Sequence, residues 1–133
     1  MTGDVVELDH VQVAAPPGSE EQARRFYRDL LGLDELRKPP ALAARGGTWF
    51  RVGPHALHVG VTHDFVPAAK AHPALRVASV DALEAIAARL ASNGVQIAWA
   101  DAREIPGTRR FHVRDPWGNR LELVARDEVG TNP

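Results

Sequence analysis

The sequence predicts an α+β fold made of two tandem βαβββ units, whose strands form a cupped mixed sheet with the helices on its outside. Three observations support this prediction: a helix pattern that recurs 60 residues later, a histidine-containing strand before each helix, and a hairpin after each helix. A chain of 133 residues has the length of one domain, so we treat residues 1–133 as a single domain. Within it we expect a first unit at 5–61, a connector at 62–71, a second unit at 72–125 and a tail at 126–133.

The two helices are indicated by apolar residues at the i, i+3, i+4, i+7, i+8 spacing that lines one face of a helix. The first stripe consists of Ala23, Phe26, Tyr27, Leu30 and Leu31, and the second of Leu83, Ile86, Ala87, Leu90 and Ala91. Ser19 and Asp81 precede these stripes and are expected to cap the two helices.

Strands are expected on both sides of each helix. Histidine-containing strands precede the helices at 8–13 and 72–77, and hairpins follow them at 49–52 with 56–61 and at 110–113 with 120–124. A further strand is expected near 36–38 or 41–44 in the first unit and near 95–99 in the second. The 115–119 segment consists mostly of turn-forming residues and is interpreted as structural.

Composition excludes several classes of function. Sixteen basic and seventeen acidic residues give a net charge of −1, which argues against nucleic acid as a partner. The absence of cysteine excludes disulfides, thiolate metal sites and cysteine nucleophiles. No apolar run approaches the roughly 20 residues of a membrane span, and the first ten residues are acidic where a signal peptide is basic. We therefore expect no membrane partner and a cytoplasmic location.

Strand alternation separates an aliphatic face from a polar face. Because the aliphatic face has to be covered by the helices, the opposite face is predicted to carry His10, His58, His72 and Glu122. The weaker candidates for contact with a substrate are Gln12, Arg51, Arg76, Arg110 and His112. The three arginines suit an anionic substrate, and salt bridges across the polar face are an equal alternative. His55, in a predicted turn, and His63 are expected at the surface.

Three local sequence motifs together indicate a known family: LDHV at 8–11, FYRDLLGL at 26–33 and, most specifically, FHVRDPWGNRLEL at 111–123. With the duplicated unit, they make the chain resemble the vicinal oxygen chelate superfamily, which includes glyoxalase I, bleomycin-resistance proteins, fosfomycin-resistance thiol transferases and extradiol dioxygenases. The resemblance covers roughly residues 5–125.

The resemblance implies one divalent metal, bound by His10 and His58 from the first unit and by His72 and Glu122 from the second. Imidazole and carboxylate ligands suit Zn, Ni, Fe, Co or Mn. It further implies a glyoxalase-like lyase or isomerase that acts on a small oxygen-chelating substrate through a metal-stabilised enediolate, with Glu122 as the catalytic base. It also implies a homodimer, in which the two units pair within one chain or are exchanged between chains.

One departure from the pattern keeps other functions open. Metal-binding glyoxalase I enzymes usually have a carboxylate in both last strands, whereas this chain has His58 in the first. The alternatives are a metal-free binding protein of the bleomycin-resistance type, an Fe(II) dioxygenase and a thiol transferase. For the last two, His10, His72 and Glu122 supply two histidines and one carboxylate.

Overall fold

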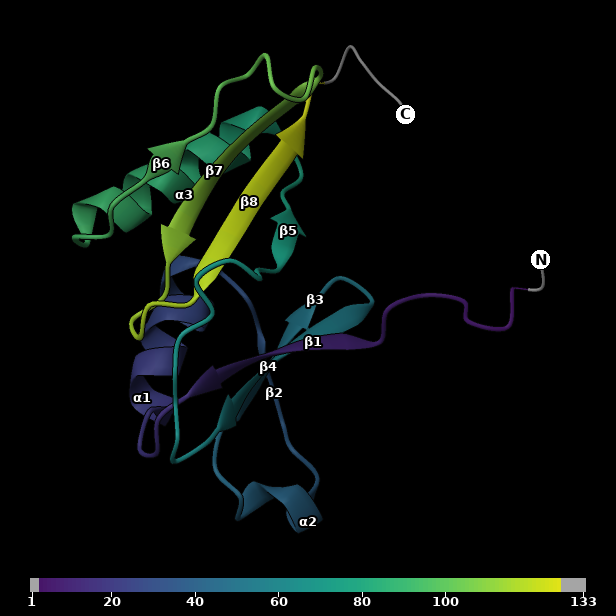
Figure 1. Cartoon of the computed structure of the whole chain (residues 1–133), viewed down its shortest axis with the longest axis vertical. Coiled ribbons are helices and arrows are strands. Elements are labelled where there is room, and N and C mark those ends of the chain that lie inside the picture. The colour runs from purple at the N-terminus through teal and green to yellow at the C-terminus, as the bar shows by residue number, and fades with distance from the viewer. Residues whose placement is uncertain (1–2, 128–133) are drawn as a thin grey trace.

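A computed structural model describes residues 3–127, which form two four-stranded sheets (Figure 1). The first unit contains β1 (His10–Ala15), α1 (Glu20–Ala23), η1 (Arg24–Leu30), β2 (Glu35–Leu36), α2 (Pro40–Ala43), β3 (Thr48–Val52) and β4 (His55–Val61). The second contains β5 (Ala74–Arg76), α3 (Val80–Ser92), β6 (Ala98–Trp99), β7 (Thr108–Arg114) and β8 (Arg120–Arg126). No helix among the described residues is long and apolar enough to cross a membrane.

Both sheets have the same topology, which confirms the predicted α+β fold of two βαβββ units. The strand orders are β1-β4-β3-β2 and β5-β8-β7-β6. In each sheet the first strand runs parallel to the last, because the helix after it crosses back over the sheet, and the remaining neighbours are antiparallel hairpins. Between residues 3 and 127 no strand pairing joins the two sheets, so they are separate rather than one continuous sheet.

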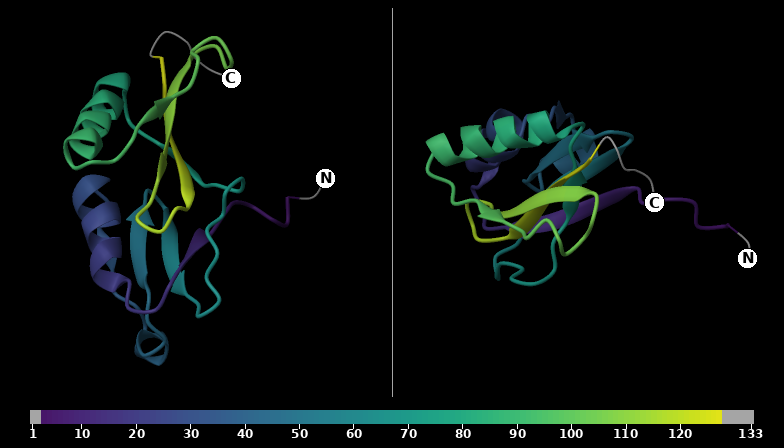
Figure 2. Two further views of the ribbon diagram at one scale, coloured as in Figure 1. Left: turned by 60° about the vertical axis from the view of Figure 1, so that its left-hand side comes forward. Right: turned by 90° about the horizontal axis from the view of Figure 1, so that it is seen from above.

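The helices α1, η1 and α3 cover one side of both sheets and form the core with them. Figure 2 shows α3 lying above α1 and η1 along one side of the molecule, with the strands on the other side. Core residues contributed by the helices include Phe26, Tyr27, Leu83 and Leu90, and the sheets add aromatic residues such as Phe111. The polar faces of both sheets are thereby left away from the core, as alternation predicts.

The first helix differs from the predicted regular α-helix. After four α-helical residues the chain widens into the π-helix η1, in which the Leu31 amide donates to the carbonyl of Phe26, five residues earlier. The wider turns rotate the last part of the apolar stripe, so Leu31 is buried whereas Leu30 is only partly buried. A π-helical segment inserts extra backbone into a helix, which a 3.6-residue period does not reveal.

Of the two predicted caps, Ser19 occupies the N-cap position and Asp81 does not. Ser19 lies at the start of α1, but its buried hydroxyl makes no hydrogen bond among the described residues. The second helix is capped by Ser79, whose Oγ accepts from the Ala82 amide at 3.1 Å. Asp81 lies instead in the first helical turn, where its negative charge interacts favourably with the positive end of the helix dipole.

Several predicted element bounds also change. The alternative strand at 41–44 is wrong because most of that segment forms α2, and the short strand β2 occupies 35–36. His55 is the first residue of β4 and is partly buried, so its assignment to a turn at the surface is wrong, whereas His63 is exposed. Of the predicted tail, residue 126 belongs to β8, the Asp127 amide donates to Gly107 O at 2.9 Å, and residues 128–133 lie outside the described part.

The turn between β7 and β8 links the two units. Buried Asp115 accepts hydrogen bonds from the Tyr27 hydroxyl at 2.8 Å and from the Asn119 backbone and side-chain amides at 2.8 and 2.9 Å. The Asn119 side chain also donates to the carbonyl of Ala14 at 2.8 Å and accepts from the Ala68 amide at 3.1 Å. The turn of the second unit is therefore bonded to η1 and β1 of the first and to the connector.

Candidate functional site

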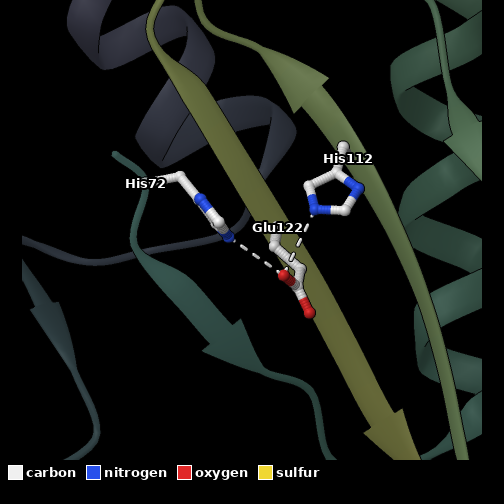
Figure 3. A group of neighbouring side chains, drawn as sticks. All are labelled: His72, His112 and Glu122. Atoms are coloured by element: carbon white, nitrogen blue, oxygen red, sulfur yellow. Dashed lines mark hydrogen bonds and ion pairs between the residues drawn. The ribbon is translucent and has the colours of Figure 1, made fainter. Parts of the chain in front are cut away.

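Three side chains of the second sheet converge on one point (Figure 3). Glu122 projects from β8, His112 lies directly opposite it on β7, and His72 comes from the segment just before β5. Glu122 Oε1 lies 3.1 Å from His72 Nε2 and 3.2 Å from His112 Nε2. Ligand atoms of all three residues lie within 4.8 Å of one another, a spacing that one metal ion can bridge.

The neighbours of this group orient its members. His72 Nδ1 lies 2.9 Å from the Lys70 carbonyl oxygen, which can only accept, so Nδ1 is the donor and Nε2 of the neutral ring keeps the lone pair that a metal ion needs. The other oxygen of Glu122 lies 3.6 Å from Arg110, which also pairs with Glu104 at 2.7 Å. Arg110 therefore forms the salt bridges that the sequence left as an alternative to substrate contact.

The surroundings of His112 favour its neutral form, which can bind a metal ion or accept a hydrogen bond. Burial lowers the pKa of its imidazole below the ordinary value of 6.5, and the nearby positive charge of Arg120 lowers this pKa further, against the opposing effect of Glu122. A neutral imidazole offers a lone pair on one ring nitrogen, which metal coordination requires.

The first sheet presents a stack of three rings instead of a charged cluster. The His58 ring lies parallel to the Trp49 ring at a centroid distance of 4.0 Å and an angle of 3°, and it stacks on His10 at 4.2 Å and 18°. Burial, followed by the charge of His10, lowers the pKa of His58 below 6.5. His10 Nδ1 also lies 2.9 Å from the Asp9 carboxylate.

The remaining substrate-contact candidates lie on both sheets. Gln12 folds its amide over Gly60, where an added Cβ would come within 2.7 Å of the Gln12 side chain and would push that amide aside. Arg51 and Arg76 are exposed on β3 and β5, and no ion pair is recorded for either among the described residues.

The structure thus brings together two of the four residues expected as metal ligands, His72 and Glu122. His10 and His58 lie in the other sheet, outside this group. The third member is His112, which the sequence suggested only as a weak substrate contact. The pairing of the hairpin could have identified His112 from the sequence. If Arg114 and Arg120 are the pair that closes the turn, residue 112 lies directly opposite residue 122.

Comparison with known proteins agrees with this architecture. The family model of the Glyoxalase/Bleomycin resistance protein/Dioxygenase superfamily matches residues 7–123. The chain belongs to this superfamily. None of the curated proteins compared with the chain matches its sequence.

Several solved structures align with nearly the whole chain. A glyoxalase family protein from Bacillus anthracis is 41% identical, with a TM-score of 0.87 over 96% of this chain and 100% of that one. A lactoylglutathione lyase from Agrobacterium tumefaciens is 18% identical, with a TM-score of 0.66 over 96% and 99%. The fosfomycin resistance protein FosX from Listeria monocytogenes is 16% identical, with a TM-score of 0.70 over 96% and 95%. At these identities, the last two similarities concern the fold alone, and the two proteins are named for different activities.

Proposed function

We propose that this superfamily member is a metal-dependent enzyme that moves a proton on a small, oxygen-rich substrate, as lyases and isomerases of the glyoxalase type do. The observation that carries the proposal is the convergence of His72, His112 and Glu122 within one sheet. His72 and Glu122 are two of the four ligands that the family resemblance implies, and His112 adds a donor from the same chain.

The donor set fits a divalent metal. Two imidazole nitrogens and one carboxylate are ligands that Zn, Ni, Fe, Co and Mn accept, and the Lys70 carbonyl supplies the outer contact that orients a ligating histidine. A metal bound here would supply Lewis acidity toward a substrate carbonyl or hydroxyl oxygen.

Glu122 is the residue proposed to move the proton. Its carboxylate is 12% exposed and therefore reachable from the polar face, while two imidazoles approach one of its oxygens. Arg110 lies beside the other oxygen and holds the carboxylate in place. A base in this position can take a proton from a carbon next to a carbonyl group and return it to the neighbouring atom.

Replacement of Glu122 tests the proposal. Purified without chelator, the wild-type protein is expected to take up close to one equivalent of Ni or Zn. Glu122→Ala is expected to lower metal affinity by about tenfold to a hundredfold or more, since even an outer-shell partner of a ligand contributes about that much. Metal analysis and a glyoxalase assay measure the two effects, with Glu84→Ala on exposed α3 as the control. A wild-type protein that takes up neither metal would overturn the proposal.

The same donor set favours one second candidate. Two histidines and one carboxylate with open positions are also the ligand set of non-haem Fe(II) oxygenases. Oxygen uptake by the Fe(II)-loaded protein with a catechol, together with no glyoxalase turnover, would select the dioxygenase. No metal uptake and no turnover, together with saturable binding of a ligand, would select the metal-free binding protein.

We also propose a homodimer that completes the ligand set. The observation in its support is that His10 and His58 lie in a different sheet from His72 and Glu122, and that β1 and β5 are both end strands. A second copy could place its first sheet against the second sheet of its neighbour.

A further inference from the structure

The stacked rings of the first sheet lie outside the cluster of His72, His112 and Glu122 that carries the proposed metal site. Trp49 and His58 are direct cross-strand neighbours on β3 and β4, and His10 lies diagonally across on β1. The three rings are nearly parallel, with successive centroid distances of 4.0 and 4.2 Å. A stack of three leaves two outward ring faces, one on Trp49 and one on His10.

This stack lines a cavity of about 770 Å³ on the polar face of the first sheet. Small-molecule sites commonly have volumes of about 300–1,000 Å³ and combine apolar walls with a few polar groups. The cavity has an apolar wall in Leu36 and Leu42, and Leu36 lies opposite Trp49 in the strand register. The Trp49 face therefore borders an apolar part of the cavity.

The charged groups around the cavity are mostly cations. Lys38, Arg45 and Arg51 line it, and Asp9 is the acidic side chain in the lining. Asp9 is already engaged by His10, and Lys38 donates to the carbonyl of Gly46. Neither Arg45 nor Arg51 has an ion pair with any residue from 3 to 127. Two guanidinium groups are therefore available to an anion beside a flat apolar surface.

We infer that this cavity binds a planar aromatic ring that carries a carboxylate. The ring would extend the stack at Trp49, because aromatic side chains favour offset stacking on a flat partner. The carboxylate would reach Arg51 or Arg45, because a guanidinium group presents two parallel N–H donors that match the two oxygens. On the second sheet, Arg110 is already paired with Glu104 and Glu122 and does not offer such a site.

A comparison of three matched probes tests this inference. Titration of the protein with 2-naphthoate, followed by calorimetry and amide NMR in the presence of chelator, is expected to give saturable binding. Decahydro-2-naphthoate keeps the charge but is not flat, and 2-naphthamide keeps the flat ring but has no charge. Both are expected to bind at least about tenfold more weakly, because each lacks one of the two interactions.

Variants then locate the bound probe. Arg51→Gln or Arg45→Gln is expected to weaken 2-naphthoate binding about tenfold or more, and Trp49→Leu about twofold to tenfold. Arg126→Gln, an equally exposed arginine on β8, is the matched control and is expected to leave binding unchanged. Thermal unfolding verifies that each variant is folded.

The outcomes separate this inference from the proposed metal site. No saturable binding of 2-naphthoate, equal binding of the saturated acid, or a loss of binding in Arg76→Gln but in neither Arg51→Gln nor Arg45→Gln would each overturn the inference. Because the titration is done in chelator, a failure of metal uptake leaves its result unaffected.

Discussion

Tyr27 is the chain's single tyrosine, and its buried hydroxyl donates to Asp115 between the two units. Burial, followed by the charge of Asp115, raises the pKa of Tyr27 well above its ordinary value of 10.0. The folded protein therefore keeps the phenolic proton at pH values where the unfolded chain releases it.

This proton difference predicts how stability changes at alkaline pH. Above about pH 10 the unfolded state holds fewer protons than the folded state, so the free energy of unfolding falls as the pH rises. Tyrosinate absorbance near 295 nm is expected to appear only as the protein unfolds, and a urea-unfolded sample serves as the control. Titration near pH 10 in the folded protein would contradict the prediction.

At the scale of elements, the turn between β7 and β8 is stabilised by a closed set of hydrogen bonds. Asn119 is 2% exposed and bonds to Asp115, Ala14 and Ala68. The sequence correctly indicated that this segment is structural, but its connection to the other unit depends on the tertiary arrangement.

Asn119→Ala is expected to reduce the free energy of unfolding by about 2–4 kcal/mol, since it leaves several buried partners unpaired. Asn93→Ala removes an exposed amide at the end of α3 and is expected to cost less than about 1 kcal/mol. Urea unfolding measures both. Equal losses in the two variants would show that the buried network does not stabilise the turn.

The comparison of sequence and structure is clearest in these elements. The two-residue alternation of the strands correctly placed His72, His112 and Glu122 on one polar face, because successive side chains of a strand point to opposite faces of the sheet. The helix period failed from Arg24 to Leu30, where a π-helix keeps the same apolar residues but shifts their direction. Ring stacking among Trp49, His58 and His10 follows from the register between strands, which the composition of each strand does not specify.

At the scale of the whole molecule, the four expected ligands are divided between two sheets. This division makes it possible to test whether two copies of the chain share one metal site in a dimer. If the units are exchanged in a dimer, one site contains His10 of one copy and Glu122 of the other. His10→Ala and Glu122→Ala would each abolish such a site, whereas a mixed dimer of the two variants retains one intact site.

Unfolding the two variants together and refolding them is expected to restore about a quarter of the wild-type metal content, from statistical pairing in a symmetric dimer. Each variant refolded alone is the control. Pairing within one chain predicts no restoration. Full metal uptake by His10→Ala alone would assign the metal to His72, His112 and Glu122 of one chain.

The two sheets carry rows of side chains at corresponding positions. Gln12, His58 and Trp49 lie side by side in the first sheet, as Ala74, Glu122 and His112 do in the second. His10 and His72 each lie two residues before the first member of their row. Structurally equivalent positions therefore hold a ring stack in one unit and a donor cluster in the other. The double substitution Trp49→His with His58→Glu would give the first unit the donor types of the second, and metal analysis should then find up to twice the wild-type content.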